Sequence, residues 1–277
     1  MTEKRNHSAI QRRLVPSYIF LIICALISVF PLFWMLTAAT NTTLEVAQGK
    51  LWFGSNAAVN FKNLLSSADL WRSMWNSFFY ATIQTVLCLL ICSLAGYGFE
   101  LYHTKGKDFL FGVLLLAMMI PGVATMIPLF KMMSKMHLLS TVWGFALPTI
   151  ATPFMIMMFR QNSRNFPVEV MDAARIDGLG EMAIFFRIFM PMMKSTYAAA
   201  AVITFMNSWN AYLWPRVVLT DPNSAKTMPI LIANLAGGYT IDYGVLMLGV
   251  LFCSLPTVIV FFVLQKQFAQ GITGAIK

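Results

Sequence analysis

One polar stretch in an otherwise apolar chain gathers residues that could form a docking surface. Between residues 160 and 194 lie four of the eleven acidic residues of the chain, namely Glu169, Asp172, Asp177 and Glu181. Ala173 and Ala174 sit among them, and Gly178 follows. A small apolar centre inside a polar rim is typical of a protein interface. The same composition suits a helix on lipid headgroups, so these residues alone leave both partners open.

The stretch has no nucleophile beside a base, no histidine and no glycine-rich phosphate loop, and the four cysteines have no metal-ligand spacing. We therefore expect no catalytic residue and no metal site in this chain.

A second polar group could contact a hydroxyl-rich solute. It consists of Asn207, Trp209, Asn210 and Tyr212. Amides and phenol hydroxyls form hydrogen bonds with sugar hydroxyls, and aromatic rings pack against sugar faces. Because Asn207 and Asn210 are three residues apart, a helix places them on one face. The alternative is that they form hydrogen bonds between helices, as polar residues of membrane bundles often do.

A third group lies near the end of the chain and comprises Asn234, Gly237, Gly238 and Tyr239. Glycines allow a backbone to approach a ligand or partner closely. These residues could contact a ligand or a partner, and a plain surface hairpin is the alternative.

The elements that must position these groups are membrane helices. The 277 residues are 58% hydrophobic and only 11% charged, whereas soluble domains have about 25% charged residues. Six stretches without Asp, Glu, Lys or Arg are each long enough to cross a bilayer as a helix. They are 14–44, 73–99, 109–130, 136–159, 195–215 and 243–265. The sequence thus predicts an all-α polytopic membrane protein with six transmembrane helices. Its parts are an N-terminal tail (1–13) and a transmembrane domain (14–277) that includes loops 160–194 and 216–242.

Lysine and arginine predict the orientation. With six spans, the side that holds both termini carries 13 of these residues and the other side carries seven. Positive residues favour the cytoplasmic side. Both termini are therefore expected on the cytoplasmic side of a bacterial inner membrane. The net charge of +9 then reflects topology and membrane lipid, and does not indicate a nucleic-acid partner.

Loop 160–194 is therefore cytoplasmic, and its sequence predicts two short helices. Pro167 and Glu169 suit the first turn of one helix. Gly178 suits a left-handed stop after it. A second helix is expected from Glu181 to residue 190, with Pro191 as its end.

The spacing within this loop resembles the signature of binding-protein-dependent ABC permeases. That signature is Glu-Ala-Ala, three residues, Gly, nine residues and Ile-x-Leu-Pro. Here Asp172-Ala173-Ala174 is followed at the same spacing by Gly178, Ile188 and Pro191. Asp172 replaces Glu and Met190 replaces Leu. Shorter similarities cover residues 31–34, 127–130 and 209–213, and they resemble the carbohydrate branch related to the smaller permease of the maltose system.

The resemblance implies the type I ABC importer permease fold and a particular assembly. The coupling residues would be Glu169, Asp172, Ala173, Ala174, Asp177, Gly178, Ile188 and Pro191. The partners would be a second, different permease subunit, two nucleotide-binding ATPase subunits and an extracytoplasmic solute-binding protein. The resemblance also implies that this binding protein contacts the loop with Asn234, Gly237, Gly238 and Tyr239. ATP and Mg would bind to the ATPase, and this chain would be a transport subunit without enzyme activity or a cofactor of its own.

The apolar stretches carry no ionisable group for proton or sodium coupling, and the chain has no Walker sequence. An external ATPase is therefore the expected energy source, and a sugar or oligosaccharide is the expected solute. The alternatives are another polar solute, such as glycerol phosphate, a polyamine or a peptide, a stand-alone secondary transporter, and a membrane scaffold.

Overall fold

A computed structural model describes residues 2–102, 104–221 and 227–274, with side chains from residue 16 to residue 263 within these ranges. All elements of the described residues are helical, which confirms the predicted all-α class. Residues 222–226 of the predicted external loop, the final residues 275–277 and the side chains of the predicted tail lie outside the described part.

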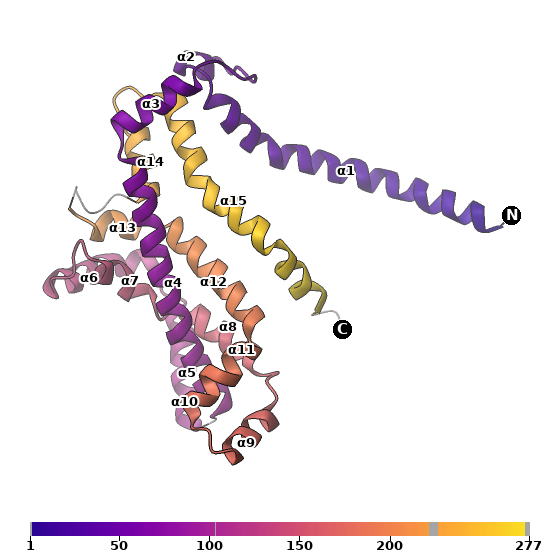
Figure 1. Ribbon diagram of the computed structural model, residues 1–277, viewed down its shortest axis with the longest axis vertical. Helices are drawn as coiled ribbons and strands as arrows, with labels where there is room; N and C mark the ends of the chain where they lie inside the picture. Colours follow the sequence, from indigo (N-terminus) through magenta and orange to yellow (C-terminus); the bar gives the residue numbers. More distant parts are fainter. Residues whose placement is uncertain (1, 103, 222–226, 275–277) are drawn as a thin grey trace. The chain divides into compact units, whose positions relative to one another are not determined.

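The helices, in chain order, are α1 (Thr2–Ala38), α2 (Thr43–Ala47), α3 (Ala57–Ser67), α4 (Leu70–Leu101), α5 (Lys105–Ala117), α6 (Gly122–Lys135), α7 (Val142–Ala146), η1 (Leu147–Thr149), α8 (Pro153–Ser163), α9 (Val168–Ile176), α10 (Glu181–Ile184), η2 (Phe185–Phe189), α11 (Met190–Met192), α12 (Lys194–Trp209), α13 (Leu213–Val218), α14 (Met228–Ala236) and α15 (Tyr243–Gly274). Figure 1 shows them in sequence colours.

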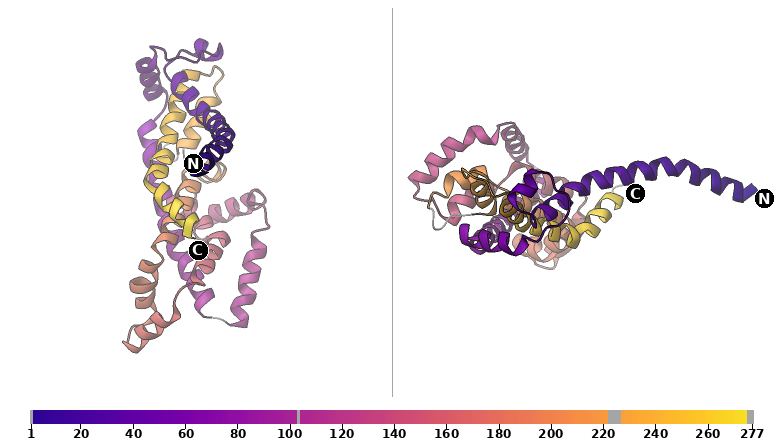
Figure 2. Two further views of the ribbon diagram at one scale, coloured as in Figure 1. Left: turned by 90° about the vertical axis from the view of Figure 1, so that its right-hand side faces the viewer. Right: turned by 90° about the horizontal axis from the view of Figure 1, so that it is seen from above.

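Three unbroken helices are long and apolar enough to cross a membrane. Their candidate spans are residues 16–38, 70–101 and 243–263. Three further candidate spans are bent pairs: α5 with α6 at 103°, α7–η1 with α8 at 52°, and the α10–α11 segment with α12 at 82°. The corner between α5 and α6 is visible in Figure 2. The predicted number of six spans holds when each bent pair counts as one.

Prolines explain why two of the predicted spans are broken. Pro121 is the N-cap of α6 and has extended backbone angles. Pro153 begins α8, and Pro148 lies in η1. Proline lacks the amide hydrogen that continues a helix, and it disfavours helical angles in the residue before it. The chain therefore leaves one helix and starts another at these positions.

The chain forms two compact units, and unit 2 contains both the polar loop and the predicted solute residues. Unit 2 comprises residues 70–231 and 255–277, and unit 1 comprises residues 1–69 and 232–254. Within unit 2, α4 packs mainly against α8 and α12. Gly96 of α4 makes this possible, because a Cβ atom there would lie 2.6 Å from the Cβ of Phe159. The close helix contact is thus built on a glycine, as in many membrane bundles.

Three apolar clusters follow one another along α4. The first surrounds Tyr80 and includes Phe145. The second surrounds Cys88 and Cys92 and includes Phe159. The third surrounds Tyr97 at the C-terminal end of α4 and includes residues of α9, α10 and η2. Since α4 contributes to all three, it forms the axis of unit 2.

Unit 1 is held together by buried asparagines. Asn60 donates from Nδ2 to the carbonyl oxygens of Ala39 and Asn41, each at 2.9 Å. Asn41 donates to Thr37 and Trp52. Gly244 must stay without a side chain, because a Cβ atom there would lie 2.5 Å from Asn60 Nδ2. Side-chain amides in this unit thus satisfy backbone carbonyls where a helix ends.

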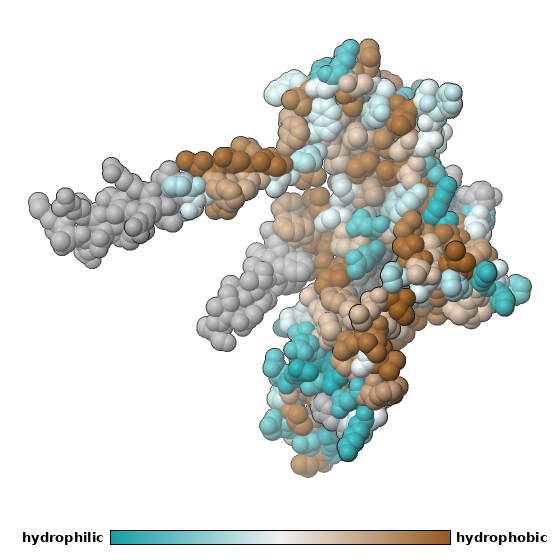
Figure 3. Space-filling view, turned by 180° about the vertical axis from the view of Figure 1, so that it is seen from behind, coloured by the Kyte–Doolittle hydropathy of each residue, from teal (hydrophilic) through white to brown (hydrophobic). Residues whose placement is uncertain are grey.

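The molecule exposes apolar side chains where lipid would surround it. In the most apolar stretch of residues 16–38 only 6% is buried, and in that of residues 243–263 only 11% is buried. Helices that are apolar on all sides need an apolar environment. Figure 3 shows hydrophilic residues gathered at the lower end, where Figure 1 places α9 and α10.

Candidate functional site

The helix α9 has one face in the core of unit 2 and one face outside it. Met171 and Ala174 are buried in the cluster around Tyr97. Asp172, Ala173 and Ile176 are exposed, and Ile176 is 86% exposed although it is apolar. This division follows from the 3.6-residue period of the helix. The outer face thus offers an apolar group beside a carboxylate at a terminus of unit 2 (Figure 1).

The two alanines of the predicted docking patch point to different sides. Ala173 is exposed, whereas Ala174 is only 6% exposed and packs against the core. Neighbouring helix residues are separated by about 100°, so both cannot share one narrow face. Of the predicted small-residue patch, Ala173 thus lies on the outer face, whereas Ala174 holds α9 against the core; the coupling role of both residues stays a prediction.

Gly178 ends α9 with a left-handed backbone, as the sequence predicts. Its φ is +83°. The amide of Gly178 donates to the Arg175 carbonyl, and the amide of Leu179 donates to the Ala174 carbonyl, both at 3.0 Å. Leu179 also packs against the core cluster. These two hydrogen bonds and the apolar contact form a Schellman motif, which fixes the direction in which the chain leaves the helix.

The second helix of the loop does not end before Pro191. It runs from α10 through five residues of π-helix in η2 into α11, where Pro191 lies in the first turn. A proline inside a helix removes one backbone hydrogen bond, and the wider π-helical turn directly before Pro191 accommodates that loss. Ile188 is half-buried against the core cluster, whereas Pro191 is exposed. The predicted stop at residue 190 is therefore wrong.

A polar cluster joins α9 to α10 and to the end of α4. Arg175 Nε donates to Glu181 Oε1 at 2.8 Å, and Arg175 Nη1 donates to Asp172 Oδ1 at 2.8 Å. Tyr102 and Tyr97 both donate to Glu181 Oε2, the latter at 3.4 Å. The Glu181 carboxylate, ahead of the Tyr102 hydroxyl, raises the pKa of Arg175 above its ordinary value.

Arg175, Asp172 and Glu181 are all at least one-third exposed, so water screens their ion pairs, which contribute little to folding. Asp172, predicted as a surface group for a partner, already binds Arg175 in the structure. Glu169 and Asp177, the other predicted acidic residues, are exposed at the two ends of α9. Arg175 and the tyrosines were not predicted, because only the fold brings residues 97 and 102 to this loop.

A second ionic cluster lies where α8 leads into the loop. Arg160 is only 8% exposed. Its guanidinium binds Glu100 of α4 and Asp108 of α5, each at 3.0 Å, and lies 4.0 Å from the centre of the Phe111 ring. This cluster clamps three helices at the end of unit 2 that also holds α9.

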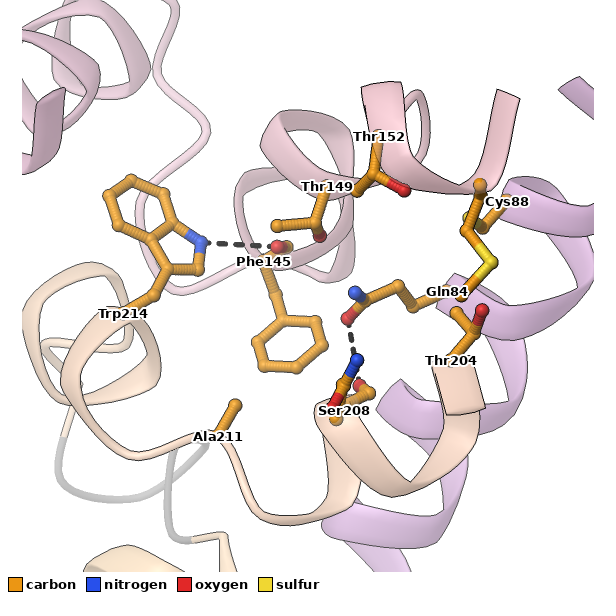
Figure 4. A pocket seen from close by; sticks show the side chains of 11 residues that line it. Gln84, Cys88, Phe145, Thr149, Thr152, Thr204, Ser208, Ala211 and Trp214 are labelled. Atoms are coloured by element: carbon orange, nitrogen blue, oxygen red, sulfur yellow. Dashed lines mark hydrogen bonds between the residues drawn. The ribbon is translucent and has the colours of Figure 1, made fainter. Parts of the chain in front are cut away.

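A cavity of about 260 Å³ lies between the clusters around Tyr80 and Cys88 (Figure 4). Helices α4, α7, α8 and α12 contribute to its wall. The lining residues are Gln84, Cys88, Phe145, Thr149, Thr152, Met155, Thr204, Asn207, Ser208, Ala211 and Trp214. None of them is charged, and the wall combines amides, hydroxyls and aromatic rings. Such a wall can bind a neutral molecule with hydroxyl groups.

Only one of the four predicted solute residues lines this cavity. Asn207 does so and is exposed. Trp209 is 1% exposed and stacks on Phe205. Asn210 donates to the Met206 carbonyl at 2.9 Å, one turn earlier. Tyr212 lies just before α13 and is outside the lining set. Asn207 and Asn210 differ because α12 ends at Trp209, and Asn210 caps that end.

The cavity contains polar residues that the sequence analysis did not select. Ser208 Oγ donates to Gln84 Oε1 at 2.7 Å, which joins α12 to α4. Thr204 Oγ1 is buried and has no hydrogen-bond partner among the described residues. Thr204, Asn207, Ser208 and Ala211 repeat at helical spacing. This pattern of small and polar residues inside an apolar stretch was a signal that could have identified the wall.

The predicted extracytoplasmic contact lies at the end of α14. Asn234 is in the last turns of this helix, and Gly237, Gly238 and Tyr239 form the turn that follows. All four are exposed, and the Tyr239 ring is fully so. The expected loop is therefore partly helical, with its glycines and tyrosine at an exposed tip. Among the described residues no group of His, Cys, Asp and Glu could hold a metal ion.

Comparison with known proteins gives consistent relatives. Residues 93–274 match the family described as binding-protein-dependent transport system inner membrane component. The lactose transport system permease protein of Rhizobium radiobacter is 44% identical, covering 98% of this chain and 99% of that protein. The arabinooligosaccharides transport system permease protein of Halalkalibacterium halodurans is 38% identical, covering 91% of this chain and 92% of that protein.

The fold also has a solved counterpart. A chain in the crystal structure of a bacterial ABC transporter involved in the import of the acidic polysaccharide alginate matches with a TM-score of 0.80. It is 20% identical, and the match covers 92% of this chain and 96% of that one. Together with the match over residues 93–274, the apolar spans and the signature in α9–α11, this places the chain in a family. The protein belongs to the inner-membrane components of binding-protein-dependent transport systems.

Proposed function

We propose that this chain is the permease subunit of an ATP-driven importer and forms part of the path for a sugar or oligosaccharide. Membership of the family supports the class of machine. Two relatives that are 44% and 38% identical are named for transport of lactose and of arabinooligosaccharides. The uncharged, hydroxyl-lined cavity is consistent with such a solute.

The observation that carries the proposal is the outer face of α9. Ile176 is a large apolar side chain with 86% exposure at a polar end of the protein, outside the candidate membrane spans. An exposed apolar anchor surrounded by charged groups is typical of the centre of a protein interface. The favoured occupant is a nucleotide-binding subunit, which would hold ATP and Mg and supply the energy. This chain would act only as its lever, without an ATPase site of its own.

The cavity distinguishes the proposed solute from charged alternatives. A phosphate ester, a polyamine or a charged peptide requires a countercharge once water is removed. The cavity wall contains no Asp, Glu, Lys or Arg. A neutral sugar needs only amide and hydroxyl partners, which Asn207, Gln84 and Thr204 can provide. A sugar is therefore the better match to this chain.

The remaining parts of the assembly follow from the same proposal. A second permease subunit would complete the path, and a second ATPase subunit would bind to it. Both termini would lie in the cytoplasm, so that α9 faces the ATPase. The exposed tip at Gly237, Gly238 and Tyr239 would face the extracytoplasmic binding protein, together with Asn234. An exposed tyrosine suits this role because it offers a large contact area and a hydroxyl group.

Purification through a tag on this chain tests the docking face. Ile176→Glu should release the ATPase subunit from the purified complex, because loss of an interface anchor costs at least about 2 kcal/mol of binding. The side chain is exposed, so the fold of the chain should survive. The amount of ATPase per permease, measured on stained gels, is the readout.

Ile176→Leu is the matched control, since it keeps an apolar group of similar size and should retain the ATPase. If Ile176→Glu also retained a full complement of ATPase, the outer face of α9 would not be the docking surface.

A further inference from the structure

Glu181 lies where three parts of unit 2 meet. It is the first residue of α10. One carboxylate oxygen accepts from Arg175 Nε of α9 at 2.8 Å. The other accepts from Tyr97, inside α4, and from Tyr102, directly after α4. Arg175 Nη2 also donates to the Tyr102 hydroxyl at 3.2 Å. One carboxylate thus connects the proposed docking helix to the end of α4.

The apolar contacts in this region cannot fix the position of α9 in the same way. Met171 and Ala174 of α9 pack in a cluster with Phe185, Phe189 and Tyr97. Apolar attraction is non-directional, so it holds α9 against the unit but allows small sliding movements. Charge-assisted hydrogen bonds are directional and short. The bonds at Glu181 therefore determine how a displacement of α9 is passed to α4.

The helix α4 can carry such a displacement to the cavity. It runs unbroken from Leu70 to Leu101, whereas the α5–α6, α7–α8 and α10–α12 pairs are all bent. Gln84 and Cys88 of α4 line the cavity. Gln84 lies thirteen residues before Tyr97, which corresponds to about 20 Å along a helix axis. The Gln84–Ser208 hydrogen bond at the cavity would then respond to the position of the far end of α4.

We propose that Glu181 is the positioning residue that transmits movement of α9 to α4, and through α4 to the solute cavity. The proposal rests on the proposed function, because it takes α9 as the helix moved by an ATPase. It gives the link a defined order: Arg175 on the α9 side, Glu181 in the middle, and the hydroxyls of Tyr97 and Tyr102 on the α4 side.

If Arg175, Glu181 and the two tyrosines act one after another, variants of these residues should show a specific pattern. Arg175→Gln cuts the α9 side. Tyr97→Phe combined with Tyr102→Phe cuts the α4 side, keeps both rings and leaves the Arg175–Glu181 ion pair in place. Glu181→Gln weakens both sides. If the three groups act in one chain of contacts, cutting both ends should be no worse than cutting one, whereas independent effects would multiply.

The experiment uses the complete complex, purified through this chain and reconstituted in vesicles with its binding protein. Labelled lactose, the sugar named for the 44% identical relative, is the probe. Uptake and ATP hydrolysis are measured on the same samples. Each variant should keep its ATPase subunit and hydrolyse ATP, while lactose taken up per ATP falls by about 2- to 30-fold, the range for residues that modulate coupling. Combining the α9-side and α4-side changes should lower it no further.

Two matched controls separate coupling from general damage. Tyr197→Phe removes a hydroxyl beside the same apolar cluster that is not among the groups donating to Glu181. Arg187→Gln removes an exposed charge from the same loop. Both should keep the wild-type ratio of uptake to hydrolysis.

Three results would overturn the role of Glu181. These are a wild-type ratio in all variants, an equal loss of hydrolysis and uptake that leaves the ratio unchanged, and multiplied effects in the combined variant. By contrast, a wild-type complex that accumulates lactose equally with and without ATP would refute the proposed function itself.

Discussion

At the scale of single residues, Asn207 and Asn210 show how a helix end separates two similar side chains. Both are amides on the α12 segment, three residues apart. Asn207 lines the cavity, whereas Asn210 uses its amide to bind the Met206 carbonyl. The spacing suggested a shared face, and this would hold only if the helix continued. Since α12 ends at Trp209, the two residues have different roles.

This difference predicts opposite outcomes for one substitution. Asn207→Leu should lower uptake by about tenfold, because it places an apolar group where the solute needs a hydrogen bond, and a polar group left without its partner costs about 1–3 kcal/mol. Asn210→Leu should lower uptake by less than threefold, since it removes only a helix cap. Initial uptake rates, divided by the amount of assembled complex, measure both. Equal losses would contradict the assignment of Asn207 to the wall.

The signature residues were predictable to different degrees. Gly178 was, because a left-handed helix end requires a residue without a Cβ atom, and its φ of +83° confirms that expectation. Burial of Ala174 was not foreseen, because spacing alone does not say which side of a helix meets the core. The role of Arg175 could not be predicted either, since its partner Tyr102 and the Tyr97 that shares Glu181 with it are more than seventy residues away in sequence.

At the scale of elements, α2 contains a capping box that depends on pH. Thr42 and Glu45 cap each other, and Lys50 binds Glu45 at 2.7 Å. The Lys50 ammonium, ahead of Thr42, lowers the pKa of Glu45 from 4.5 to about 2. Because the folded pKa is lowered, this cap stabilises α2 fully above pH 4.5, and the stabilisation is lost as the pH falls towards 2.

Carbon NMR of labelled glutamate in detergent micelles can follow this titration. Glu45 in the wild type should titrate with a midpoint near 2, and Lys50→Met should move the midpoint up towards 4.5. A midpoint that stays near 2 without Lys50 would show that the ammonium is not the main cause.

The helices α4, α5 and α8 depend on a charge that they bury together. Arg160→Met should lower the stability of the purified chain by about 1–3 kcal/mol, because Glu100 has little solvent and loses its closest partner, although Arg164 remains at 3.6 Å. Glu100 is 12% exposed, whereas Asp108 is 54% exposed. Asp108→Asn should therefore cost only about 0–1 kcal/mol. Denaturation in detergent, followed by circular dichroism, measures both, and equal losses would contradict the clamp.

The positions of the spans were predictable, and their internal breaks were only partly so. Long stretches without charge must be helices in lipid, which identifies the spans from the sequence. Pro121 marked the corner between α5 and α6. The π-helix in η2 had no comparable signal: Pro191 suggested a stop, but the preceding turns widened and the segment continued. Such a local adjustment depends on packing of Phe185 and Phe189 in the core.

At the scale of the whole molecule, charged residues and the uncharged solute cavity lie in different regions. The six apolar stretches contain no Asp, Glu, Lys or Arg that could couple transport to an ion gradient, and the solute cavity has an uncharged wall. Charged residues concentrate at the end of unit 2 around α9, where one ionic cluster joins α4, α5 and α8 and the other joins α9 to α10. This separation is consistent with a chain that binds its solute in one place and receives energy in another.

ATP dependence of uptake tests the central claim most directly. The complex is purified through this chain from its own membrane, reconstituted in vesicles with the extracytoplasmic fraction as the source of binding protein, and given labelled lactose. We predict that lactose accumulates only when ATP is available to the ATPase subunit, and that collapse of proton and sodium gradients has no effect. Accumulation that continues without ATP and follows an ion gradient would contradict the claim that this chain is the permease of an ATP-driven importer.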